Sequence, residues 1–189
     1  MDTIAKSYKA AMSNGRGRQF EMMIEGACRY YRDTGRANIV KMPEPFRVIT
    51  KDRANGKATV QFTAKAQPDF VGCLNNGRAI VFEAKYTDTG RIQRRVVTDA
   101  QANALQKYWE MGAVAAVCVG FGDAWDMKFF MLPWVVFCRM KYRYGRQYIT
   151  PDDIGEYRVK FDGVVYLLDF HDTHIAECRN SRKPLTKED

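Results

Sequence analysis

The sequence lacks any apolar run long enough to cross a membrane. No stretch of its 189 residues reaches the ~18 consecutive apolar residues that a spanning helix requires, and the amino-terminal segment has no signal-peptide core. The chain also has no internal repeat and no low-complexity segment. These absences exclude helical membrane proteins and solenoids, and we expect a cytoplasmic protein with no membrane partner.

Cysteine and histidine are scarce. The five cysteines are odd in number and mostly set in apolar runs, as expected for reduced core thiols in a cytosolic protein. His171, His174 and Cys178 could share one helical face and are zinc-ligand types. However, no fourth ligand is local and no Cys-x-x-Cys accompanies them, so a structural zinc is the less favoured interpretation and their role stays open.

Basic residues outnumber acidic ones by 30 to 22, which gives a net charge of +8. Hydrophobic residues make up 46% of the chain, with 11 Phe and 10 Tyr, so the protein is globular and not disordered. The length fits a single domain with a sizeable core. A basic balance in such a domain favours nucleic acid as a partner.

Residues 68–85 predict a hairpin that brings charged side chains together at one sheet edge. Asp69 opens the first strand, and Asn76-Gly77 supplies the positive φ of a tight turn. An apolar run follows and ends in Glu83 and Lys85, which period 2 puts on one face. Because the start of one hairpin strand lies beside the end of the next, we expect Asp69 to lie close to Glu83.

These side chains have the chemistry of a magnesium site. Carboxylate oxygens are the ligands that Mg²⁺ accepts, and a neighbouring lysine can stabilise phosphate charge or orient a water. An isolated Glu-x-Lys is more often a weak structural ion pair. Here Pro68-Asp69 precedes Glu83-Ala84-Lys85 by a strand, a turn and a strand. That order is the signature of the PD-(D/E)XK nuclease superfamily, which this chain resembles.

Apolar spacing predicts a helix from residue 18 to about 32. Glu21, in its first turn, either favours the helix dipole or aims a further carboxylate at the metal site. Residues 1–17 are expected to form a mobile basic arm, because Asn14-Gly15-Arg16-Gly17 breaks any helix there. This arm either contacts phosphate or is a disordered terminus without a role.

Basic side chains gather around the predicted site. Strands at 46–51 and 58–63 predict a hairpin, which is either a solvated turn or a projecting finger over about 50–66. A polar loop follows Lys85, and residues 139–148 interleave cations with aromatics, as nucleic-acid surfaces do. The candidate DNA-binding residues are Arg16, Arg18, Lys51, Arg53, Lys57, Lys65, Arg91, Arg94, Arg95 and Arg143.

The remaining elements predict a mixed sheet with helices against it. Thr98 and Gln101 have capping-box spacing at the start of a helix, and residues 113–119 form a buried strand after it. Strand, helix and strand imply a right-handed parallel crossover. Gln101 either only caps the helix or orients water or substrate at the site. Further predictions are a strand at 128–131, a short helix opened by Pro133-Trp134, a turn, short strand and closing helix over 150–170, and a frayed tail over about 179–189.

The flanking motifs resemble RecU-type Holliday junction resolvases over about residues 14–170. The matching motifs, in family order, are Gly15-Arg16-Gly17-x-x-Phe20-Glu21-x-x-Ile24, Tyr30-Tyr31, Pro43-x-Pro45, Asp69, Glu83-Ala84-Lys85, Gln101 and the apolar strand at 112–121. The chain departs from the family at Pro68, where threonine is usual, at Gly15, where asparagine is usual, and in a shorter stalk hairpin. The resemblance implies an α/β, restriction-endonuclease-like core and a two-fold homodimer that nicks opposed strands of a four-way junction.

The resemblance also implies roles for the site residues. Asp69, Glu83 and the Ala84 carbonyl would bind Mg²⁺, with Mn²⁺ as an alternative and no organic cofactor, in recombination and repair of branched DNA. Lys85 would position the water, Gln101 would orient water or substrate, and Glu21 would support the metal shell. A recombinase is a further candidate partner. Two alternatives remain: a PD-(D/E)XK nuclease with another DNA target, and a non-catalytic DNA-binding accessory factor.

Overall fold

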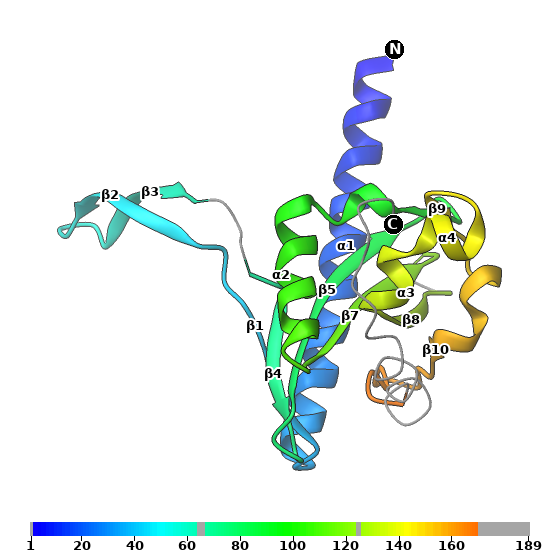
Figure 1. Ribbon diagram of the computed structural model, residues 1–189. Helices are drawn as coiled ribbons and strands as arrows, with labels where there is room; N and C mark the ends of the chain where they lie inside the picture. The colour runs from blue at the N-terminus through cyan, green and yellow to red at the C-terminus, as the bar shows by residue number, and fades with distance from the viewer. Residues whose placement is uncertain (1, 64–66, 124–125, 170–189) are drawn as a thin grey trace.

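A six-stranded mixed sheet forms the centre of the molecule (Figure 1). The computed structural model describes residues 2–63, 67–123 and 126–169. In spatial order the strands are β1 (Ala37–Lys41), β4 (Phe70–Leu74), β5 (Ala79–Thr87), β7 (Val114–Phe121), β8 (Lys128–Pro133) and β10 (Arg158–Val159). The β5–β7 pair is parallel and the other pairs are antiparallel. The predicted mixed sheet and parallel crossover are therefore confirmed.

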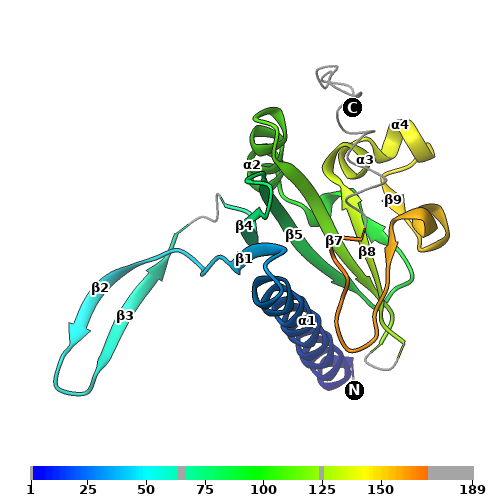
Figure 2. The same ribbon diagram turned by 90° about the horizontal axis from the view of Figure 1, so that it is seen from below.

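Helices cover both faces of this sheet (Figure 2). Helix α1 (Asp2–Asp33) lies on one face, and α2 (Asp99–Glu110) and α3 (Trp134–Cys138) lie on the other, with α4 (Met140–Tyr144) following. Pro133 precedes the short helix α3, as predicted. All eight residues of β7 are buried, which explains its unbroken apolar sequence, because a central strand covered on both faces has no polar side.

Helix α1 is longer than the sequence predicted. The helix runs without interruption from Asp2 to Asp33, so the break predicted at residues 14–17 was wrong. The predicted basic arm is therefore helical from Asp2 onward. Glycine costs a helix only about 1 kcal/mol relative to alanine. Once Phe20 and the following apolar stripe pack on the sheet, each added residue contributes a hydrogen bond, so the helix propagates past its glycines.

Strands β2 (Phe46–Asp52) and β3 (Lys57–Phe62) form a separate hairpin that projects from the β1–β4 edge of the sheet (Figures 1 and 2). Asp52 pairs with Lys57, and Gly56 takes the positive φ of 63° that the turn requires. The predicted hairpin is confirmed. Lys65 lies outside the described residues.

The remaining elements of the chain are short. Strand β9 (Tyr148–Ile149) pairs with β6 (Ile92–Gln93), and the 3₁₀ helices η1 (Arg94–Val96) and η2 (Asp152–Tyr157) complete the order. Between 150 and 169 the chain forms a turn, η2 and β10 but no α-helix, so the predicted closing helix is wrong for these residues. A bridge between Phe161 and Val165 folds the backbone back on itself there, which a helix could not do. The zinc-ligand types at 171, 174 and 178 and the tail from 179 lie outside the described residues.

Within the described residues, no helix is both long and apolar enough to cross a membrane.

Candidate active site

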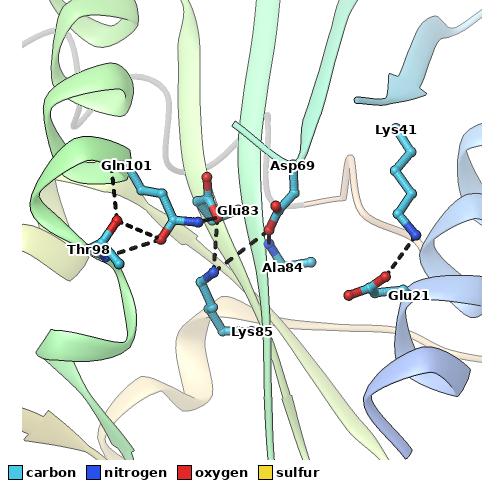
Figure 3. Close-up of polar contacts among 8 residues, drawn as sticks. All are labelled: Glu21, Lys41, Asp69, Glu83, Ala84, Lys85, Thr98 and Gln101. Carbon is cyan, nitrogen blue, oxygen red and sulfur yellow. Dashed lines mark hydrogen bonds and ion pairs between the residues drawn. The ribbon is translucent and has the colours of Figure 1, made fainter. Parts of the chain in front are cut away.

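The hairpin of β4 and β5 places Asp69 beside the carboxyl half of β5 (Figure 3). Phe70 pairs with Phe82 across this hairpin, so Asp69, the residue before β4, stands opposite Glu83. The Asp69 Oδ2 atom accepts a hydrogen bond of 3.1 Å from the backbone N–H of Ala84. The expected approach of the two carboxylates is thus present, and a backbone bond fixes the orientation of the first.

Glu83 is completely buried within β5. Its Oε2 accepts a hydrogen bond from Gln101 Nε2 at 2.6 Å and forms an ion pair with Lys85 Nζ at 3.0 Å. Its Oε1 has no hydrogen-bond partner among the described residues. Burial raises the pKa of Glu83, as does the neighbouring Asp69 carboxylate, while Lys85 acts in the opposite direction. One oxygen of a buried carboxylate therefore remains available to a further ligand.

Lys85 joins the two carboxylates. It stands two residues after Glu83 on the same strand face, and its Nζ lies 3.0 Å from Glu83 Oε2 and 3.8 Å from Asp69 Oδ2. The lysine is largely buried beside them. One cation between two carboxylates partly compensates their repulsion, and it leaves an ammonium group where a phosphate oxygen would approach.

Gln101 links helix α2 to the site, because it caps the helix and also contacts Glu83. Its role in orienting water or substrate stays a prediction. Its Oε1 accepts from the Thr98 backbone N–H at 3.1 Å, and Thr98 Oγ accepts from the Gln101 backbone, which completes the capping box. With that oxygen held at the helix start, the amide nitrogen points to Glu83 (Figure 3). The capping box therefore fixes which end of the amide meets the buried carboxylate.

Glu21 lies on α1 and is paired elsewhere. Its carboxylate accepts a hydrogen bond of 2.7 Å from Lys41 of β1 (Figure 3). The same ammonium lies 2.9 Å from Glu25. A role for Glu21 in a metal shell stays a prediction. Sequence reasoning missed Lys41, since nothing local signals an ion pair between residues 20 positions apart.

The residues present fit a hard divalent cation. Mg²⁺ is usually held by one or two carboxylates, with waters filling the remaining positions. Asp69 and Glu83 supply two converging carboxylates, and the buried Glu83 Oε1 lacks a hydrogen-bond partner among the described residues. Those residues contain no group of three or more His, Cys, Asp or Glu side chains placed to hold a metal, so a dedicated all-protein cage is not found in the described ranges.

Several predicted DNA-binding cations pack against aromatic rings. The Arg94 guanidinium lies 5.2 Å from the ring centroid of Trp134 and bonds to the Val97 carbonyl, so part of its function is structural. Arg143 pairs with Glu156 at 2.7 Å. Its guanidinium also lies over the Tyr144 ring, 5.9 Å from the centroid, so the alternation of cations and aromatics after residue 139 has a packing explanation. Contacts of these arginines with DNA stay predictions, while Arg95 and the cations of the β2–β3 hairpin are exposed.

Comparisons with known proteins show which family the chain belongs to. The family model described as Recombination protein U (RecU) matches residues 15–173. Among solved structures, the chain is similar to Archaeoglobus fulgidus Hjc, a Holliday junction resolvase from an archaeal hyperthermophile, at 12% identity and a TM-score of 0.43, over 77% of this chain and 92% of that one. No curated protein matches the sequence. Since the family model spans most of the chain, the protein belongs to the RecU family.

Proposed function

We propose that this protein is a metal-dependent, structure-selective DNA endonuclease that resolves four-way junctions by paired nicking during recombination and repair in the cytoplasm. The observation that carries the proposal is the Asp69–Glu83–Lys85 cluster, with its orphaned Glu83 oxygen, in a chain of the RecU family. A structural ion pair has no need for a second buried carboxylate, because each buried charge costs desolvation energy.

The side chains divide the chemistry among them. Asp69, Glu83 and the Ala84 carbonyl would hold Mg²⁺, or Mn²⁺ in its place. The bound ion supplies charge stabilisation to the phosphate and lowers the pKa of water. Lys85 neutralises a phosphate oxygen and holds the attacking water near the carboxylates, within reach of its three donors. Gln101 holds Glu83 Oε2, so Oε1 would be the oxygen that binds the ion.

The β2–β3 hairpin is the feature that would select branched DNA. It carries Lys51, Arg53 and Lys57 at its far end and stands clear of the sheet (Figure 1). Entry into the central opening of a junction would bring these cations close to phosphates of several strands, where negative potential is highest. Linear duplex offers no such opening.

A homodimer would cut two opposed strands with two equivalent sites. A four-way junction has two-fold symmetry, and a closed two-fold dimer matches it. Light scattering at micromolar concentration should give twice the chain mass of 21.7 kDa. A fully active protein with a monomeric mass would contradict paired nicking by a dimer.

The experiment that tests the proposed function compares three substrates. The protein is incubated with a synthetic four-way junction, with linear duplex and with single-stranded DNA, each with Mg²⁺ and with a chelator. We expect symmetric nicks in the junction only, and only with the ion. Equal cleavage of duplex would favour a nuclease with another target, and tight junction binding without cleavage in Mg²⁺ or Mn²⁺ would favour an accessory factor.

A further inference from the structure

A basic pocket lies at the sheet edge opposite the hairpin. It has a volume of about 500 Å³ and is formed by α1, the start of β8 and the segment 158–161. Lys128, Arg158 and Lys160 contribute its cations, and Met23 and Phe129 contribute apolar walls. Neither the predicted site nor the predicted DNA-binding residues include these three cations. Such a concave surface suits a ligand with negative charge and a less polar body.

The cations of this pocket are available to a ligand. Lys128 lies 3.6 Å from Asp126, and Lys160 lies 2.6 Å from Asp162, but both pairs are solvent-exposed and are therefore weak. Within the described part of the chain, no ion pair joins Arg158 to a carboxylate. Three cations line the pocket, and two carboxylates lie beside them, Asp126 in the lining and Asp162 next to Lys160, so one positive charge remains uncompensated.

Strand register relates this pocket to the candidate active site. Lys85 pairs with Val119, Val119 with Phe130, and Phe130 with Arg158, so Lys85 and Arg158 stand in one row across the sheet. Three steps at the usual strand spacing separate their backbones by about 14 Å. This distance corresponds to about four base pairs of duplex at its rise of ~3.4 Å per base pair.

The active site lies between the hairpin and the pocket. The hairpin leaves the sheet at β1 and β4 (Figure 1). Asp69 directly precedes β4 and Glu83 lies on β5, whereas the pocket is lined by residues of β8 and β10 at the far edge of the sheet. If the hairpin occupies the crossover, one arm of the junction extends from the hairpin past the active site and across the sheet. The pocket then meets duplex on the side away from the crossover.

We propose that the pocket of Lys128, Arg158 and Lys160 binds a backbone phosphate of a junction arm, about four base pairs from the scissile phosphate. This inference rests on the proposed function and extends it from the crossover to the arm. The pocket adds affinity and fixes the direction of the arm, and it contributes nothing to the choice of bases, because phosphate contacts carry no sequence information directly.

The test is a scan of neutral linkages along one arm. Methylphosphonates replace single phosphates at successive positions from the crossover, and binding is measured without divalent ions so that no strand is cut. For the wild-type protein we expect a several-fold loss at one or two positions along the arm. Arg158→Ala should remove that loss and leave the losses near the crossover unchanged. Its salt dependence of binding should also be shallower by about one unit of slope.

Lys107→Ala is the matched control, since Lys107 is an exposed cation in the last turn of α2, outside the pocket. It should reproduce the wild-type scan. Lys128→Ala and Lys160→Ala repeat the test and guard against misfolding of the Arg158 variant. Identical scans for the wild type and all three pocket variants would overturn the arm contact while leaving the resolvase proposal intact. A wild-type protein that binds linear duplex as tightly as junction would overturn both.

Discussion

Strand β7 and the strands of the β2–β3 hairpin have the same secondary structure but opposite environments. All eight residues of β7 are buried, whereas all seven residues of β2 are exposed. The hairpin nevertheless contains large apolar side chains, with Phe46 54% and Phe62 64% exposed. A two-stranded hairpin is marginally stable on its own in water. Pairing and turn chemistry thus suffice to specify a strand, while its burial depends on what lies against it.

This difference separates two functions. The sheet desolvates Glu83 and holds its partners at fixed distances, as a catalytic site requires. The hairpin keeps its cations in water, where they can meet phosphates without a large desolvation cost. We therefore expect changes in the sheet to affect cleavage and stability, and changes in the hairpin to affect substrate choice.

Replacing the first carboxylate should have the largest effect. We expect Asp69→Ala to lower the rate of junction cleavage by at least about 100-fold, because even outer-sphere partners of metal ligands are worth 10–100-fold. Junction binding should stay within a few-fold, since the basic surfaces supply the affinity. Single-turnover cleavage and anisotropy measure the two quantities. Near-normal cleavage by Asp69→Asn in Mg²⁺ would refute the site.

Two phenylalanines, one packed on the sheet and one in the hairpin, compare how much each region contributes to the free energy of unfolding. Phe20 is buried, and its ring stacks on Phe129 at 5.6 Å, so Phe20→Ala should cost about 3–5 kcal/mol in the free energy of unfolding. Phe62→Ala in the hairpin should change it by less than about 0.5 kcal/mol. Urea unfolding measures both. A large loss for Phe62→Ala would mean that another surface covers the hairpin in solution.

Lys85→Ala tests whether a residue of the sheet affects cleavage more than DNA binding. The ammonium lies between both carboxylates, so we expect strongly reduced cleavage and a smaller loss of junction binding than a hairpin deletion causes. The reason is that Lys85 is one cation among many in the footprint. Cleavage rates at saturating Mg²⁺ separate a role of Lys85 in cleavage from a role in recruiting the ion. Full cleavage activity at saturating Mg²⁺ would leave the lysine a purely structural partner of Glu83.

Gln101→Glu separates the two roles of Gln101. Glutamate is favoured at this capping-box position, so helix α2 should survive, but a carboxylate cannot donate to Glu83. We expect cleavage to fall about 10–100-fold. The melting temperature should fall as well, because the new carboxylate is buried against Glu83, but the helicity of α2 should be retained. Gln101→Ala serves as the comparison, because it should lose both the cap and the contact. Unchanged cleavage in the glutamate variant would make Gln101 a cap only.

Replacing Arg53 to Lys57 with a Gly-Ser turn should have the smallest effect on the fold and a selective effect on binding. We expect junction affinity to fall by about tenfold and duplex affinity to change little, with a shallower salt dependence for the junction. Competition binding with both substrates measures the ratio. An equal loss on both substrates would make the hairpin a general basic surface, and no loss on either would make it an ordinary turn.

Local sequence determined much of the fold. The Asn-Gly turns, the capping box of Thr98 and Gln101, and the parallel crossover were all predictable, because each depends on residues close in sequence. So was the approach of Asp69 to Glu83, since a hairpin of known turn position fixes which residues stand opposite each other. Charge and motif order indicated a nucleic-acid enzyme of the RecU type, which the family model confirms.

Only the tertiary structure decided what these residues meet. Packing of α1 on the sheet continues the helix past Gly15 and Gly17, against their local preference. Burial isolates Glu83 Oε1, and Lys41 pairs with Glu21 across 20 residues. Sheet register aligns Arg158 with Lys85 across three strand pairings. These relations depend on how close segments that are remote in the chain come in space. Sequence periodicity specifies which face of a helix or strand a side chain occupies, but not which residue of another element packs against that face.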